Sequence, residues 1–321
     1  MIRPVLRRWA VASAGAVIGL LWVSDSSAQE VTRPTTAHVE AVDAERLYLD
    51  ACSPCHGRDG DGQGPAARLL GDSQPRDFTA AVYKFRATPT GSLPTDEDVF
   101  RTISRGVPGT WMPAWEDLLT EAQRWALIRY IKGFSEFFEL EEPDPAIPIP
   151  PERESTPELV AEGRFVYAAL KCEQCHGPLG QGDGPSADEL TDDWDRKIVP
   201  YDFTHGQYKN GRTPMDIYRT LATGLSGTPM PAFEPGIVLF PGGSDVDVGS
   251  MSAGLDDETI RGLRTYLDNQ PTANEIAGLS EDEALRIAED RLWALVSYLQ
   301  TLDRPRSLFD RLFRGNPELD P

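Results

Sequence analysis

The most constraining feature of this 321-residue chain is a sequence unit that occurs twice, each time opening with the pattern Cys-x-x-Cys-His. The matching blocks are residues 52–67 with 172–187, residues 76–79 with 201–204, and residues 100–115 with 218–233. The first pair is identical at nine of 16 positions and the last pair at eight of 16. Long blocks repeated in the same order at nearly constant offsets indicate two domains of one kind, for which the chain is long enough.

Both units carry helix start signals in matching places. Thr120 with Gln123 and Ser280 with Glu283 form capping boxes, and apolar side chains then recur at helical spacing. In the first unit these side chains are Leu127, Tyr130, Ile131 and Phe134. In the second unit they are Leu285, Leu292, Leu295, Val296 and Leu299, which we expect to be buried. Further helices are predicted at 42–51, 157–171 and 256–269, and from the caps Thr95 and Thr213 to Gly106 and Gly224. No alternating strand pattern occurs, so the sequence predicts an all-α fold of two tandem domains.

The N-terminal residues have the pattern of an export signal. Arg3, Arg7 and Arg8 precede an apolar run at 9–23, and small residues at 26–28 form a cleavage site. The apolar run is shorter than the ~20 residues that a membrane-spanning helix needs. We therefore expect a cleaved signal peptide and a periplasmic protein, with an uncleaved membrane anchor as the alternative.

The remaining boundaries follow from the repeat and from proline content. Six prolines at 143–157 predict a semi-rigid polyproline II spacer, or else a strap packed along both domains. The second unit also contains an insertion that the first unit lacks. The predicted segments are a signal peptide at 1–28, domain 1 at 29–142, a Pro-rich linker at 143–157, domain 2 at 158–303 with an insertion at about 234–279, and a tail at 304–321.

Two cysteines three positions apart, followed at once by histidine, are suited to covalent haem attachment. The thiols form thioethers with the macrocycle, and the imidazole binds the iron. Cys52, Cys55 and His56 form one such set, and Cys172, Cys175 and His176 form the other. A shared zinc site would need two pairs far apart in the chain, and a thioredoxin-like motif would need a βαβ unit. The pattern therefore predicts two haem c groups.

A second iron ligand should repeat as the histidine does. Met112 and Met230 occupy matching positions in the pattern Gly-Thr-x-Met-Pro-Ala, and a thioether ligand stabilises reduced iron. Met215 and Met251 are rivals in the second unit. The unrepeated His38 and His205 are expected at the surface rather than on iron. The loop containing Asp59 and Asp61 lacks the distal glutamate of a calcium-binding loop, so we interpret it as a tight turn.

With these motifs, each unit resembles a class I c-type cytochrome domain, and the whole resembles an exported dihaem cytochrome c. The resemblance covers most of the chain outside the N-terminal segment, linker, insertion and tail. It implies a haem held among three or more helices, with the proximal histidine oriented by a backbone carbonyl. Pro65 and Pro185 match the position whose carbonyl has that role in the family.

Charge and motifs together limit the function. The chain carries 51 acidic and 31 basic residues, a net charge of −20, which excludes a nucleic-acid binder and predicts redox partners with a basic docking face. Three functions remain. They are a carrier of single electrons between periplasmic or membrane partners, a relay subunit linking a larger oxidoreductase to the respiratory chain, and a dihaem peroxidase. Catalysis needs an open iron site, so two Met-ligated irons favour a non-enzymatic electron-transfer protein.

Overall fold

The structure, a computed structural model, describes residues 42–71, 73–243, 248–251 and 255–303. The predicted signal peptide, His38 and the predicted tail lie outside these residues. Within them the only strand-like pairing is an isolated bridge between Thr191 and Lys197, so the all-α prediction is confirmed. None of the helices described is long and apolar enough to cross a membrane.

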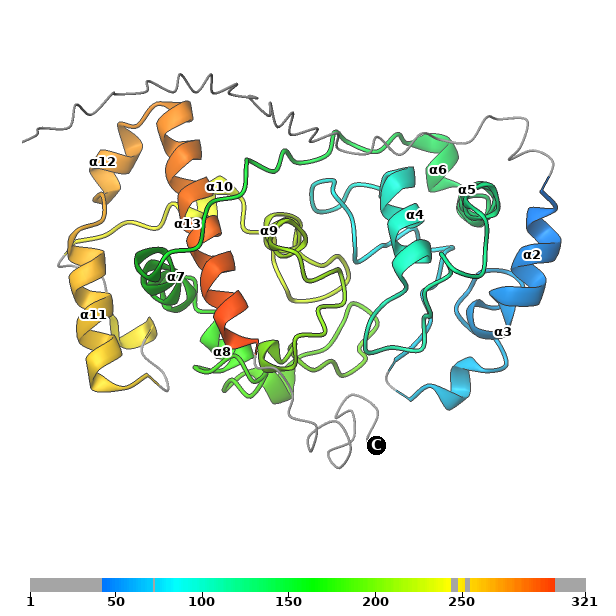
Figure 1. The fold of residues 1–321 in the computed structure, drawn as a ribbon, viewed down its shortest axis with the longest axis horizontal. Coiled ribbons are helices and arrows are strands. Elements are labelled where there is room, and N and C mark those ends of the chain that lie inside the picture. Colours follow the sequence, from blue (N-terminus) through cyan, green and yellow to red (C-terminus); the bar gives the residue numbers. More distant parts are fainter. Residues whose placement is uncertain (1–41, 72, 244–247, 252–254, 304–321) are drawn as a thin grey trace, which may run out of the picture. The chain divides into compact units, whose positions relative to one another are not determined.

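Domain 1 contains short helices joined by long loops (Figure 1). They are α2 (Ala44–Ala51), α3 (Ser53–His56), the 3-10 helix η1 (Ala67–Leu69), α4 (Asp96–Arg105), α5 (Glu121–Lys132) and α6 (Phe137–Leu140). The predicted capping box of α5 is present, and Thr95 also caps α4 in a capping box with Asp98. Helices α2 and α4 both pack on α5, around the buried Tyr48, Ile103 and Ile128.

Domain 2 repeats this plan and adds helices. Its elements are α7 (Pro157–Ala169), α8 (Glu173–His176), η2 (Ala187–Glu189), η3 (Phe203–His205), α9 (Pro214–Thr223), α10 (Pro235–Val238), η4 (Val248–Met251), α11 (Asp257–Asp268), α12 (Ala273–Ala277) and α13 (Glu281–Leu302). Thr213 caps α9, which ends at Gly224 as predicted. Asp256 likewise caps α11, so the helix predicted at 256–269 is confirmed.

The long helix α13 closes domain 2 as α5 closes domain 1. Two aromatic pairs show the equivalence. The ring centroids of Tyr48 and Tyr130 lie 5.2 Å apart in domain 1, and those of Tyr167 and Tyr298 lie 5.5 Å apart in domain 2. The predicted capping box at Ser280 is present. Four of the five side chains expected in its core are buried: Leu292, Leu295, Val296 and Leu299.

The fifth, Leu285, is 43% exposed, so its predicted burial is wrong. The first buried residue of α13 is Ala288, two turns into the helix. Helical spacing shows which face of a helix is apolar, but it does not show where along the helix the neighbouring element begins.

The insertion packs on α7 from the side opposite the domain 2 core. Leu263 and Leu267 of α11 are fully buried together with Ala168 of α7 and Val248 of η4. On its other side, α7 buries Val166 and Tyr167 against α13. Helix α7 therefore lies between α11 and α13 (Figure 1).

The proline-rich segment lies as a strap along both domains. The Ile147 amide donates to the Ala87 carbonyl over 2.8 Å, and the Asp144 amide donates to Ser92 Oγ over 2.9 Å, both in domain 1. The Ile147 and Ile149 side chains pack against the core of domain 2. Of the two predicted alternatives, the structure therefore shows the strap.

Direct hydrogen bonds also join the domains. The buried Arg86 of domain 1 donates from Nη2 to the Thr223 carbonyl at the end of α9, over 2.9 Å. Thr90 Oγ1 donates to the same carbonyl over 3.0 Å. An ion pair of 3.4 Å joins Arg105 to Asp216. These contacts and the strap join the two repeated units at several points.

The crossing of α7 and α13 generates a stability prediction. A Cβ on Gly163 of α7 would meet the Ala294 carbonyl of α13, so Gly163→Ala should lower the free energy of unfolding by about 1–3 kcal/mol. Urea denaturation of the holoprotein measures this. Gly236→Ala is the matched control, because a Cβ there has open space around it and should change stability by less than about 0.5 kcal/mol. Equal effects of the two substitutions would contradict the packing.

Candidate haem sites

Each Cys-x-x-Cys-His motif folds into one helical turn. In domain 1, the Cys55 and His56 amides donate to the Cys52 carbonyl over 3.1 and 2.9 Å. In domain 2, the Cys175 and His176 amides donate to the Cys172 carbonyl over 3.3 and 2.9 Å. Residues three and four apart share a face of a helix, so each turn places two thiols and an imidazole on one side.

The thiol surroundings disfavour zinc. All four cysteines are free, and burial raises the pKa of Cys52 to about 11 and also raises that of Cys172 and Cys175. Zinc binds thiolate, and burial disfavours that form at Cys52, Cys172 and Cys175. No group of three or more His, Cys, Asp or Glu side chains that could hold a metal ion occurs in the part of the chain that the structure describes.

A backbone carbonyl orients each imidazole. His56 Nδ1 lies 3.0 Å from the Arg76 carbonyl, and His176 Nδ1 lies 2.9 Å from the Tyr201 carbonyl. A carbonyl only accepts, so Nδ1 carries the proton and Nε2 keeps its lone pair for iron. Desolvation lowers the pKa of both histidines, which favours the neutral form that binds metal.

These carbonyls correct the assignment of Pro65 and Pro185 to this role. The residues on either side of Pro65 fold back on the cysteine turn, where the Gly64 and Ala66 amides donate to the Cys55 and Pro54 carbonyls. In domain 2, the Gly184 and Ser186 amides hold the segment around Pro185 in the same way.

A backbone hydrogen bond two residues later holds the Arg76 carbonyl next to the imidazole. The Phe78 amide donates to the Gly60 carbonyl over 2.7 Å. The Phe203 amide and the Gly180 carbonyl make the matching bond in domain 2, also at 2.7 Å.

Aromatic rings hold both histidines, a feature that the sequence analysis missed. Phe78 stacks on His56 with ring centroids 4.5 Å apart, and Phe203 stacks on His176 at 4.6 Å. Both phenylalanines belong to the repeated tripeptide Asp-Phe-Thr, and this repeat is the sequence signal that could have identified them as part of the site. Tyr48 and Tyr167 add a matched pair of bonds, donating to the carbonyls of the glycines that follow the two histidines over 2.8 and 2.7 Å.

The two methionine loops have the same hydrogen bonds. The Met112 amide donates to Thr110 Oγ1 over 3.1 Å, and the Met230 amide donates to Thr228 Oγ1 over 3.3 Å. The Met112 carbonyl accepts from the Val107 amide at 3.0 Å, and the Met230 carbonyl accepts from the Leu225 amide at 3.1 Å. The rival Met215 lies on α9 with 44% of its surface exposed. The two loops therefore place Met112 and Met230 in equivalent positions.

The surroundings of the domain 1 histidine fit a haem in polarity. Tyr83 stacks on Phe78 at 6.3 Å, and its Oη is buried with no hydrogen-bond partner among the described residues. Beside it, burial and the nearby Arg76 charge lower the pKa of Lys84 to about 8. A buried donor without a partner is costly, and a haem propionate is an acceptor that would relieve the cost. A neutral imidazole, two thiols, a stacked phenylalanine and a tyrosine hydroxyl unpartnered within the described part of the chain together suit a covalently attached haem.

The comparisons with known proteins decide the family. Residues 39–131 match the family model described as cytochrome C oxidase, cbb3-type, subunit III, and residues 160–271 match the model for cytochrome c. A chain from the reducing HAO-like protein complex of Kuenenia stuttgartiensis is 36% identical, with a TM-score of 0.63, covering 86% of this chain and 100% of its own. The chain belongs to the c-type cytochromes. Its tandem domains are cytochrome c domains, which bind haem covalently and transfer electrons. No curated protein matches the sequence.

One acidic side chain in this cytochrome is buried inside a Cys-x-x-Cys-His turn. Glu173 lies within the second Cys-x-x-Cys-His motif and is 0% exposed. Its Oε2 has no hydrogen-bond partner among the described residues, and burial raises its pKa to about 7. Neither its burial nor its raised pKa was anticipated from sequence, because a glutamate between two cysteines carries no burial signal of its own.

This burial predicts a pH-dependent stability. Since folding raises the pKa of Glu173 above its ordinary value, the folded state loses stability as pH rises from about 4.5 to about 7. Glu173→Gln should therefore gain about 2 kcal/mol over the wild type between pH 5 and pH 8, measured as the free energy of unfolding in urea. Glu189→Gln removes an exposed carboxyl from the same domain and should show no such gain. A constant difference between Glu173→Gln and wild type at both pH values would contradict the prediction.

Proposed function

We propose that this cytochrome binds two haem c groups and passes single electrons between protein partners, without catalysing a reaction itself. The observation that carries the proposal is the internal duplication of the whole site. Each domain has the same cysteine turn, carbonyl-oriented imidazole and methionine loop. Haem supplies one-electron chemistry when bound.

The residues proposed to hold each haem are matched across the domains. Cys52 and Cys55 form the thioethers in domain 1, with His56 Nε2 and the Met112 thioether as axial ligands. In domain 2 the corresponding residues are Cys172, Cys175, His176 and Met230. Two saturated irons leave no position for a substrate, which disfavours a dihaem peroxidase.

A relay subunit of a larger complex is favoured over a free carrier by one observation. The similar Kuenenia stuttgartiensis chain comes from a reducing HAO-like protein complex, and the present chain spans its full length. We infer that this cytochrome, too, associates with a larger oxidoreductase. Its charge of −20 suits a partner with a basic docking face.

Stopped-flow oxidation of the reduced protein by a cationic acceptor across a salt series distinguishes a free carrier from a permanent complex. A free carrier should slow steeply as the Debye length falls to ~10 Å at 0.1 M salt, and a permanent complex should not.

Export to the periplasm is also proposed, from the pattern at residues 1–28. N-terminal sequencing of the mature protein tests it. A first residue near Gln29 would support cleavage, and retention of the apolar segment would support the membrane anchor.

Haem content provides the primary test. The wild type should retain two haems per chain after acid–acetone extraction, measured by the pyridine haemochrome assay, because thioethers resist extraction. Cys172→Ala combined with Cys175→Ala should leave one, and Cys52→Ala combined with Cys55→Ala should also leave one. Retention of two haems in either double variant would exclude that pair as an attachment site.

The axial ligands have their own spectroscopic test. The oxidised wild type should show a weak sulfur-to-iron band at the red end of its spectrum, and the reduced protein should bind carbon monoxide poorly. Met112→Ala or Met230→Ala should remove half of the band and open one iron to carbon monoxide. Met215→Ala, on an exposed position of α9, should change neither property. Strong carbon monoxide binding or rapid peroxide turnover by the wild type would favour an enzyme instead.

A further inference from the structure

The duplicated domains allow one haem site to serve as the control for the other. The distance from the histidine Nδ1 to the carbonyl is 3.0 Å in domain 1 and 2.9 Å in domain 2. The centroids of the stacked histidine and phenylalanine rings lie 4.5 Å apart in domain 1 and 4.6 Å apart in domain 2. Two corresponding positions beside the histidines nevertheless differ in charge. Position 76 corresponds to 201, and position 53 corresponds to 173.

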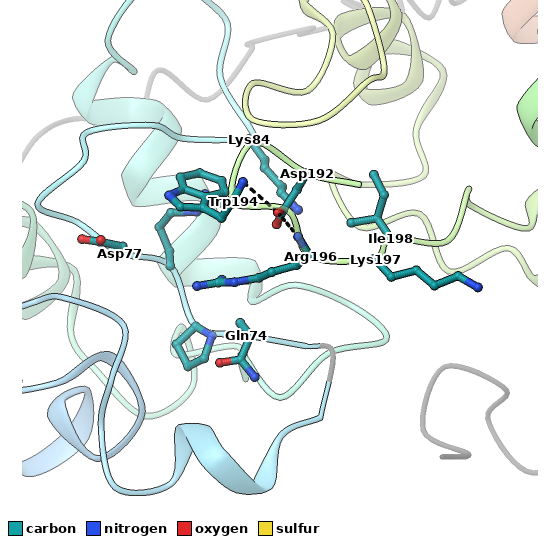
Figure 2. Close-up of a pocket in the computed structure, with 10 residues that line it drawn as sticks. Gln74, Asp77, Lys84, Asp192, Trp194, Arg196, Lys197 and Ile198 are labelled. Carbon is teal, nitrogen blue, oxygen red and sulfur yellow. Dashed lines mark hydrogen bonds between the residues drawn. The ribbon is translucent and has the colours of Figure 1, made fainter. Parts of the chain in front are cut away.

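Domain 1 has a cation where domain 2 has a neutral residue. Arg76 provides the carbonyl that accepts from His56, so its guanidinium lies within one side-chain length of that imidazole. Arg76 is one of the residues that line a pocket together with Lys84 and Trp194. Its Cζ lies 5.4 Å from the centre of the Trp194 ring, and Figure 2 shows Trp194 and Lys84 in this pocket. Burial lowers the pKa of Arg76, but a guanidinium stays charged in proteins. The corresponding residue in domain 2 is Tyr201, whose side chain supplies no cation.

Domain 2 has an acid where domain 1 has a neutral residue. Glu173 is fully buried, and its carboxylate Oε1 accepts a long hydrogen bond of 3.5 Å from Gln174 Nε2. The corresponding Ser53 of domain 1 donates from its hydroxyl to the Leu49 carbonyl over 2.8 Å. An ionised Glu173 therefore places a negative charge next to the second cysteine turn, with no matching charge in domain 1.

Buried charges act strongly on a nearby redox centre, because little water screens them. A buried cation stabilises an added electron and raises the reduction potential, and a buried anion lowers it. Arg76 therefore raises the reduction potential of domain 1, and an ionised Glu173 lowers that of domain 2, so both increase the difference in potential between the domains. The matched histidine and phenylalanine contacts contribute no opposing difference.

We propose that Arg76 and Glu173 give domain 1 the higher reduction potential, so that electrons enter this cytochrome at domain 2 and leave from domain 1. The proposal rests on the proposed function, since it requires two haems with the same ligands. For each electron taken from a one-electron donor protein at domain 2, one electron passes to domain 1 and on to a one-electron acceptor protein. No bond is made or broken.

Spectroelectrochemical titration of the holoprotein at pH 8 tests the order. The wild type should show two one-electron waves. Glu173→Gln should raise the lower wave, and Arg76→Gln should lower the upper wave. Each should change the ratio of reduced to oxidised protein at fixed potential by roughly three- to tenfold, a tenfold change being 59 mV for one electron.

Controls on the same domains separate buried from exposed charge. Asp188→Asn removes a carboxylate that is 98% exposed on η2, and Arg68→Gln removes an exposed cation on η1. Neither should move a wave by as much as the buried substitutions. If a glutamine variant does not fold, Glu173→Ser and Arg76→Tyr replace it, because each introduces the residue found at the corresponding position of the other domain.

The outcomes distinguish this proposal from the one on which it rests. Two haems with waves that do not move, or Glu173→Gln acting on the upper wave, would overturn the order of potentials alone. A single haem in the wild type would overturn the proposed function and the order together.

Discussion

The bond from each imidazole to a backbone carbonyl is the constraint on which the rest of each domain depends. It requires the chain to return to the histidine 20 residues later in domain 1 and 25 residues later in domain 2. The C-terminal helix region of each domain lies close over this loop. A Cβ on Gly60 would lie 2.6 Å from the ring of Phe134, just after α5, and one on Gly180 would lie 2.7 Å from Leu302 of α13. Helix packing and imidazole orientation are therefore coupled through these glycines.

Sequence reasoning succeeded where the signal is local. Capping boxes at Thr120 and Ser280 involve residues three apart, and both form as predicted. The cysteine turns are equally local. The repeat supplied the longer-range equivalence of Met112 and Met230, because their loops could be aligned with each other. The structure confirms that equivalence, although their ligation of iron remains a proposal.

Sequence reasoning failed where the determinant was a backbone atom or a distant surface. Any residue has a carbonyl, so nothing in the sequence marks Arg76 or Tyr201 as the acceptor, and the family pattern pointed to Pro65 and Pro185 instead. Leu285 lies on the apolar face of α13 but before the part of that helix with buried residues. The burial of Glu173 likewise depends on how the turn is covered, which its neighbours in sequence do not reveal.

The strap fixes the two domains to each other, which determines the kind of reaction that electron transfer between them would be. A free proline-rich spacer would make the second domain a tethered reactant, with an encounter frequency set by linker length and by friction with the solvent. Here the Ile147 amide is bonded to domain 1, its side chain packs on domain 2, and Arg86 is bonded to the last turn of α9. The two domains therefore need no diffusional encounter with each other. Under the proposed function, electron transfer between the two domains is then a first-order event at fixed separation, and its rate does not depend on the viscosity of the medium.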